Sequence, residues 1–165
     1  MRLLRLRWPP GLAVLATLAL LAGCAGPKYT VDDGRPVNPQ LLEQITLYGK
    51  GEQVLRPAIR RAAGLQDPDC DRQWELPFTL ASSEGWAEND RVAWVRALGV
   101  DERLTVVATS ADSPLEKGER VTDIDGYTSG DPADLLERLG RLRDRGDAFE
   151  LNTKSGRRVT VQPFE

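Results

Sequence analysis

The sequence predicts a mixed α+β protein, because helical and strand patterns occupy different parts of the chain. Helix-start signals, in which Asn or Asp precedes a proline, occur at Asn38-Pro39 and at Asp131-Pro132. Runs that alternate apolar and polar residues end the chain, at Phe149 to Thr153 and Arg157 to Pro163, and Lys154-Ser155-Gly156 between them favours a hairpin turn. In a chain of 165 residues, these patterns predict one modest domain with an appendage.

Composition excludes several classes of function. The chain contains no histidine, which removes Ser/His/Asp and Cys/His nucleophile systems and the His-ligated zinc sites of most hydrolases. Its acidic balance, 22 basic against 25 acidic side chains, lacks the positive surface that nucleic-acid binding requires. We therefore expect no nucleic-acid partner, no resident metal and no cofactor.

The N-terminus has the pattern of an export signal. Three arginines lie within the first seven residues, and the apolar stretch Gly11 to Gly23 follows. As a helix these 13 residues would span about 20 Å, less than the roughly 30 Å hydrocarbon core of a membrane. A cleaved signal peptide over residues 1–23 is therefore favoured over a permanent membrane span.

Leu21-Ala22-Gly23-Cys24 resembles the lipobox of bacterial lipoproteins. The resemblance implies that Cys24 receives fatty acyl groups such as palmitate and becomes the mature N-terminus, which attaches the chain to a membrane. Ala25 stands where an aspartate would, by that family's sorting rule, favour the inner membrane, so the periplasmic face of the outer membrane is expected. Cleavage would remove three arginines and no acid, lowering the net charge from −3 to −6.

Between the anchor and the C-terminal part we expect a tether over residues 24–38 and a helical pre-segment over 39–73. The tether is rich in Gly, Pro and Asp, and its sequence shows no periodic pattern of apolar residues. In the pre-segment, a short helix from Pro39 would stop before Gly49, and a second would run from about Glu52 to Ala63, starting or kinking at Pro57.

Residues 74–165 alternate short strands with helices. The strand candidates here are Leu76 to Leu80, Leu104 to Ala108 and Gly118 to Ile124. An amphipathic helix is expected from Asp90 to Leu98. The helix that begins at Asp131-Pro132 should end at Gly146 and bury one stripe of leucines. The expected stripe consists of Leu135, Leu136, Leu139 and Leu142.

Several short motifs in this part resemble a bacterial PDZ domain. They are Ser113-Pro114, Gly118-Glu119-Arg120-Val121, the turn Asp125-Gly126, and Asp134-Leu135-Leu136 in the helix. The resemblance covers residues 74–165 and implies a partly open β-barrel flanked by helices, which binds a peptide by adding it as a strand. The pre-segment resembles the segment found beside PDZ domains in relatives of envelope metallopeptidases. Those enzymes need an HExxH motif, and this chain contains no histidine, so the resemblance extends only to their non-catalytic module.

The sequence departs from the PDZ pattern at the expected carboxylate-binding loop. There it reads Leu76-Pro77-Phe78, and proline has neither an N–H group to donate nor a free φ. Capture of a peptide's terminal carboxylate is therefore not expected, whereas strand addition remains open. The candidate groove residues are Leu76, Phe78, Thr79, Leu80, Leu135 and Leu139.

Taken together, these features predict a non-enzymatic, membrane-anchored lipoprotein that binds another envelope protein or a peptide. One alternative keeps the fold and makes the chain a structural or assembly lipoprotein whose groove is filled by its own side chains. A more remote alternative is a histidine-free serine hydrolase, in which Ser110, Ser113 or Ser129 would act with Lys117.

Overall fold

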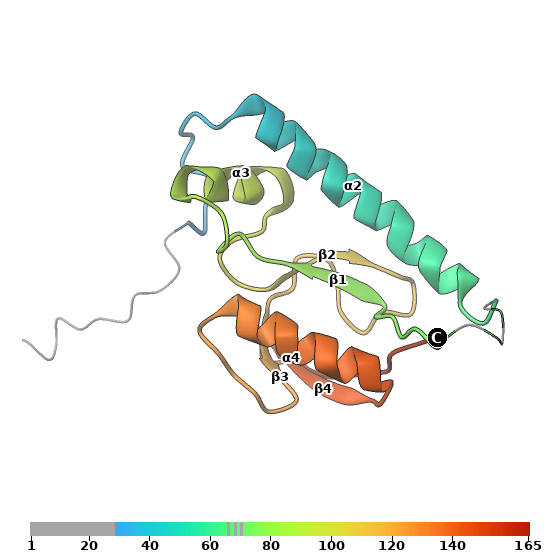
Figure 1. Cartoon of the computed structure of the whole chain (residues 1–165). Coiled ribbons are helices and arrows are strands. Elements are labelled where there is room, and N and C mark those ends of the chain that lie inside the picture. Colours follow the sequence, from blue (N-terminus) through green and yellow to red (C-terminus); the bar gives the residue numbers. More distant parts are fainter. Residues whose placement is uncertain (1–28, 66, 68, 70) are drawn as a thin grey trace, which may run out of the picture.

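The computed structural model describes residues 29–65, 67, 69 and 71–165. Within these residues the fold is mixed α+β, with three helices and two small antiparallel sheets, which confirms the predicted class (Figure 1). The first sheet pairs β1 (Phe78–Ala81) with β2 (Thr105–Thr109). The second has the order β3 (Val121–Ile124), β4 (Phe149–Thr153) and β5 (Arg158–Val161).

Two isolated bridges connect the sheets. Thr105 of β2 pairs with Arg120, just before β3, and Glu75, before β1, pairs with Phe164, after β5. The second bridge has two backbone hydrogen bonds, of 2.8 and 3.0 Å between the nitrogen and oxygen atoms. The described strands nevertheless do not close into a barrel, so the structure shows two linked sheets where a partly open barrel was expected.

Helix α2 (Pro39–Ala62) is continuous, so the prediction of two shorter helices was wrong. Asn38 caps it as expected, by accepting a hydrogen bond from the Gln40 N–H. Gly49 lies inside this helix and does not end it. Its role is to let α2 lie close to α3 (Glu88–Leu98), because a Cβ atom at this position would come within 2.3 Å of Leu98 Cδ2. Pro57 also lies inside α2.

Helix α4 (Pro132–Arg145) follows the sequence pattern closely. Asp131 accepts from the Ala133 N–H at 2.8 Å, and Gly146 ends the helix in the left-handed conformation with φ 72°. Leu135, Leu139 and Leu142 are buried as predicted. Leu136 is 39% exposed, so its assignment to the buried stripe was wrong.

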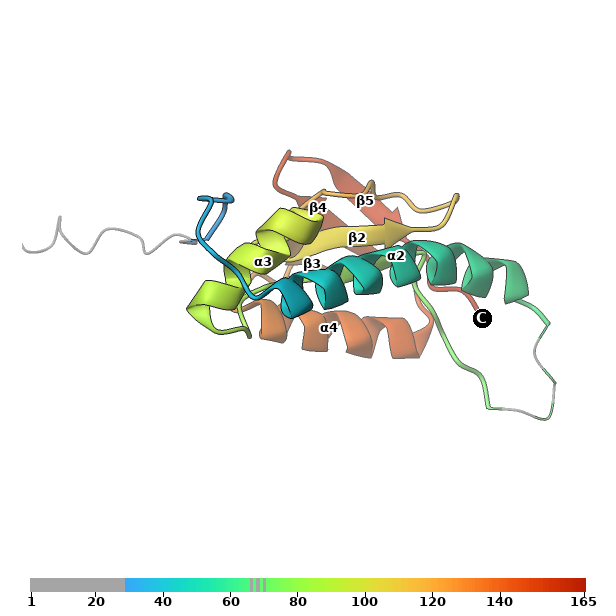
Figure 2. The ribbon, with the colours of Figure 1, turned by 90° about the horizontal axis from the view of Figure 1, so that it is seen from above.

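The β1–β2 sheet lies between two layers (Figures 1 and 2). Helices α2 and α3 cover one face, and α4 with the β3–β4–β5 sheet lies on the other. We call the cluster on the α4 side the inner core; it contains Phe78, Val106 and Leu135. The cluster under α2 and α3, which contains Ile45 and Val107, is the outer core. Neighbouring residues of β2, Val106 and Val107, thus belong to opposite cores, as the alternation of a strand requires.

Candidate functional site

The structure brings most of the predicted groove residues together, in the interior. Leu76, Phe78, Leu135 and Leu139 all belong to the inner core, and each is at most 7% exposed. Leu80 is partly buried and packs against the same cluster. These side chains fill the space between β1 and α4, so an incoming peptide would meet the rim of this contact.

Thr79 points to the opposite face of β1. Its hydroxyl donates to Glu52 Oε2 at 2.7 Å and accepts from Arg56 Nε at 3.1 Å. Arg56 also donates to the Leu76 carbonyl at 3.0 Å and to Glu75 Oε2 at 2.9 Å. This polar cluster fixes α2 to the start of β1, and Thr79 has a structural role in it.

The exposed residue beside β1 that sequence reasoning missed is Leu136. It lines a hollow of about 440 Å³ between the N-terminus of α4 and the residues after β1. The other lining residues are Ser82, Glu84, Gly85, Asp131, Pro132 and Ala133. The available signal was the position of Leu136, which lies about 100° around the helix from Leu135 and so at the edge of the leucine stripe.

Acidic groups mark this hollow. Burial raises the pKa of the Glu84 carboxyl above its ordinary value, and the nearby Asp131 carboxylate adds to the effect. Within the described residues, Glu84 Oε2 is buried without a hydrogen-bond partner. The rim beside Leu136 therefore combines an apolar side chain with negative charge.

The edge of β1 that faces away from β2 has no strand beside it among the described residues. Leu80 lies opposite Val106 of β2, and Val106 uses both backbone groups elsewhere, donating to the Glu119 carbonyl and accepting from the Gly118 N–H. Leu80 and Val106 are therefore a non-hydrogen-bonded pair, and the N–H and C=O of Leu80 point away from β2. This edge is the one a β-strand partner would need.

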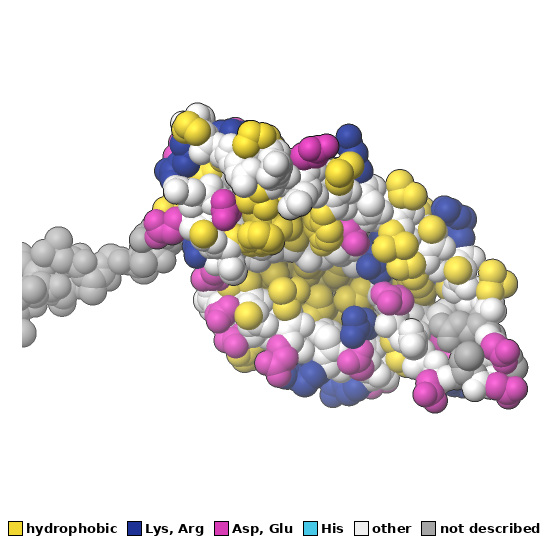
Figure 3. Space-filling model, turned by 45° about the horizontal axis from the view of Figure 1, so that its top comes forward, with side chains coloured by type: hydrophobic (Ala, Val, Ile, Leu, Met, Phe, Trp, Pro, Cys, Tyr) yellow, Lys and Arg dark blue, Asp and Glu magenta, His cyan; other side chains and the backbone are white. Residues whose placement is uncertain are grey.

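Apolar side chains gather in a hollow across the face that contains α2 (Figure 3). At the α2–α3 side is a pocket of about 320 Å³, which we call the aromatic pocket. It is lined by Leu41, Gln44, Ile45, Tyr48, Trp86 and Trp94. The Trp94 ring lies 5.5 Å from that of Trp86 and 5.8 Å from that of Tyr48 between centroids. Trp94 Nε1 has no hydrogen-bond partner among the described residues.

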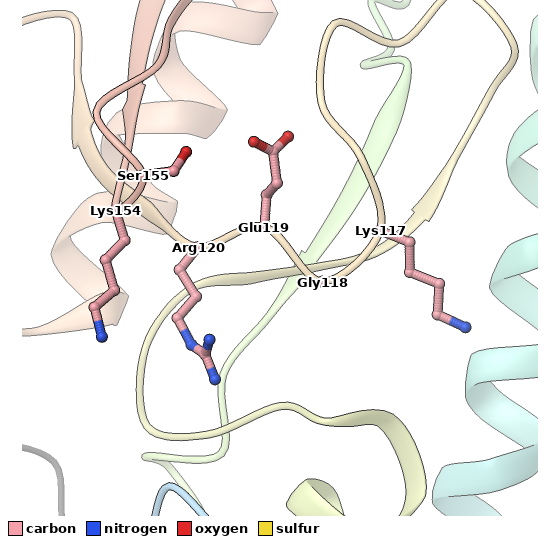
Figure 4. A pocket seen from close by; sticks show the side chains of 6 residues that line it. All are labelled: Lys117, Gly118, Glu119, Arg120, Lys154 and Ser155. Atoms are coloured by element: carbon pink, nitrogen blue, oxygen red, sulfur yellow. The ribbon is translucent and has the colours of Figure 1, made fainter.

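A third hollow, of about 470 Å³, is lined by basic side chains that do not converge (Figure 4). Lys117 points away from Arg120 and Lys154. Arg120 is held by the carboxylate of Asp101, at 3.0 Å between Nη2 and Oδ2. A bound anion needs several donors aimed at one point, so this arrangement does not form an anion site.

Asp101 itself is fully buried between the layers. It pairs with Arg103 as well as with Arg120. Burial opposes ionisation of Asp101, but the hydrogen bonds from Arg103 and Arg120 outweigh it and hold the pKa of this carboxyl below its ordinary value. Both carboxylate oxygens accept hydrogen bonds from arginine side chains, which indicates a structural role.

The serines considered for hydrolysis have other partners. Ser110 Oγ lies 2.7 Å from Asp112 Oδ1, Ser113 donates to the Leu115 carbonyl, and Ser129 donates to Asp134. In the described part of the chain none of them bonds to Lys117, and no group of His, Cys, Asp or Glu side chains is placed to hold a metal ion. Cys24, the predicted lipidation site, lies outside the described residues.

No protein-family model matches the chain, and neither does any curated protein. Among the helices of residues 29–65 and 71–165, none combines the length and apolar character that crossing a bilayer requires.

Proposed function

We propose that this chain is a periplasmic lipoprotein, held at the outer membrane through Cys24, whose C-terminal part is PDZ-like and binds a segment of another envelope protein. The partner adds as a strand to the free edge of β1, beside α4. The observation that carries this proposal is the outward direction of the Leu80 backbone groups in a strand with no neighbour on that side among the described residues. Binding, and not catalysis, is the proposed activity.

The order of elements supports the PDZ-like assignment. After β1 and the inserted helix α3, the strands β2 and β3, the helix α4 and the strands β4 and β5 occur in the order that the resemblance implies. Two isolated bridges link the two sheets. Asp125 and Gly126 both have positive φ, 54° and 76°, as the predicted reversal after β3 requires. Pro77 has no N–H group, so it supplies no donor for a terminal carboxylate at the start of β1, and its carbonyl accepts from the Ser110 N–H.

Hydrogen exchange at two adjacent amides tests the free edge. Ser110 pairs with Pro77, so alternation directs the Thr79 N–H toward β2 and the Leu80 N–H toward the open side. We expect the Leu80 amide of the free protein to exchange quickly and the Thr79 amide slowly. A protected Leu80 amide in the absence of partner would contradict strand addition at this edge.

Crosslinking in intact cells tests the partner. Leu136→Asp alters the rim of the β1–α4 contact without entering the core, whereas Leu65→Asp changes an 81% exposed leucine elsewhere. We expect Leu136→Asp to lose crosslinked partners that Leu65→Asp retains, and Cys24→Ala to lose the membrane-dependent ones. Leu135→Asp is unsuitable, because Leu135 is 4% exposed and the change would place a charge in the inner core.

The second candidate is a structural or assembly lipoprotein with a self-filled groove. The burial of Leu135 and Leu139, 4% and 6% exposed, favours it, because groove-lining side chains of a free binding domain would be more accessible. This candidate predicts that the Leu80 amide is protected from the start, so the same exchange experiment separates the two.

A further inference from the structure

Residues that precede α2 are fixed against α3. The Tyr29 hydroxyl donates to Glu88 Oε2 at 2.9 Å, and Arg96 donates to both carboxylate oxygens of Asp32, each at 2.7 Å. Arg96 also donates to the Arg35 carbonyl at 2.9 Å. Much of the predicted tether is thus part of the folded domain. Tyr29, the first of these residues to contact α3, lies beside the start of that helix.

The remaining connection to Cys24 is short. Residues 24–28 are five in number, and five residues span at most about 18 Å even when fully extended. With Cys24 lipidated, as in the proposed function on which this inference rests, the Tyr29 end of the domain stays within that distance of the bilayer. The C-terminus lies at the opposite end in both ribbon views (Figures 1 and 2).

The aromatic pocket lies at the same end as Tyr29. Arg91 connects the two, because its Nε donates to the Trp86 carbonyl at 2.9 Å and its guanidinium lies 5.9 Å from the centroid of the Tyr29 ring. Trp86 and Tyr48 are 41% and 38% exposed, which is unusual for large aromatic side chains with an apolar pocket between them. With Cys24 lipidated, the short connection would therefore keep this exposed aromatic surface near the membrane.

We propose that the aromatic pocket rests on the lipid surface that holds Cys24. Trp and Tyr favour the membrane interface, where an apolar ring and a polar group are both accommodated. Trp94 is 8% exposed and packs against Trp86 and Tyr48, so the contact with lipid falls to the two more exposed rings, those of Trp86 and Tyr48. A surface of a few side chains is small for a stable protein interface, whereas a short connection raises its local concentration at the bilayer.

Fluorescence quenching by brominated lipids tests the orientation. Lipidated protein purified from cells is reconstituted in phosphatidylethanolamine and phosphatidylglycerol vesicles, with or without lipids brominated near the top of the acyl chains. Trp74→Phe keeps Trp86 and Trp94 as reporters. Trp86→Phe is the matched control: it removes the exposed ring of the pocket and keeps Trp94, which is 8% exposed, and Trp74, whose ring lies against Gly146 at the C-terminal end of α4.

We expect a roughly twofold loss of emission for Trp74→Phe in the brominated vesicles. The loss should be smaller for Trp86→Phe, because the pocket tryptophan that remains, Trp94, is largely buried. Equal quenching of both variants, or none in Trp74→Phe, overturns the orientation and leaves the lipid anchor in place. Intact mass of the same samples reports the anchor separately: an unmodified Cys24 overturns the anchor of the proposed function and this inference with it.

Hydroxyl-radical footprinting of the unsubstituted protein gives a second measurement that does not depend on the folding of a variant. Vesicles should protect Trp86 and Tyr48 and leave Trp74 unchanged. Protection of Trp74 alone would place the opposite end on the membrane and contradict the proposal.

Discussion

The inner and outer cores bury opposite faces of the same β1–β2 sheet by different means. Among the described residues, the inner core contains thirteen buried side chains drawn from all five strands, α4 and the loops, and the outer core six, centred on α2 and α3. Polar contacts supplement the outer core, as where Arg56 of α2 bonds to the Leu76 carbonyl and to Glu75. The comparison indicates that the sheet and α4 form the stable part of the molecule, with α2 as an added layer.

The exposed surface of α2 is consistent with this difference. Leu47, Val54 and Leu55 are 58%, 72% and 48% exposed, so a large part of its apolar surface contributes nothing to burial. A helix held by fewer buried contacts opens at a lower free-energy cost than a core strand. We therefore expect the two layers to differ in hydrogen exchange.

The largest expected effect comes from truncating one residue in each core. Leu151→Ala in β4 removes a fully buried side chain and should lower the free energy of global unfolding by about 2–5 kcal/mol. Ile45→Ala in α2, at a site 3% exposed, should accelerate exchange of α2 amides while the β4 amides keep most of their protection. Denaturant titration and amide exchange measure the two effects, and an equal loss of protection in α2 and β4 would show that the layers unfold as one unit.

An intermediate effect is expected at Asp101, which joins the loop after α3 to Arg120 before β3. Because its folded-state pKa lies below the unfolded value, its contribution to stability is complete above the unfolded pKa, near 4, and is lost as the pH falls through the folded pKa. Asp101→Asn should lower the free energy of unfolding at pH 7 by about 1–3 kcal/mol. The difference between variant and parent should shrink below about pH 4; a difference that is constant with pH would show that the charge of Asp101 is not what stabilises the fold.

The smallest effect compares two glycines of α2. A Cβ atom at Gly51 would meet only open space, so Gly51→Ala should stabilise the protein by about 0.5–1 kcal/mol through helix propensity. Gly49→Ala gains the same propensity but must displace the end of the Leu98 side chain, so it should stabilise less than Gly51→Ala or destabilise. Thermal unfolding of the pair measures this; a larger gain at Gly49 would mean that α2 and α3 do not approach closely.

Local signals predicted much of the fold, and long-range packing decided where those predictions were wrong. The cap and proline at Asp131-Pro132 and the left-handed Gly146 were readable because each acts on its own neighbours. The helix expected to stop before Gly49 continues through it. At Gly49 α2 packs closely against Leu98 of α3, and the local sequence does not show this long-range contact. Leu136 was wrongly assigned to the core, because helical periodicity shows which face of the helix is apolar but not how far around the helix burial extends.

By itself, the sequence determined the α+β class, the position of the α4 helix and the terminal hairpin, because caps, turns and alternation depend on residues a few positions apart. The predicted export and lipidation signals are likewise linear patterns. Only the tertiary structure decided that both faces of β1 are covered, that the candidate groove residues Leu135 and Leu139 are interior, and that tether residues pack on α3. Those features depend on contacts between segments far apart in the chain, and no local pattern encodes the distance between them.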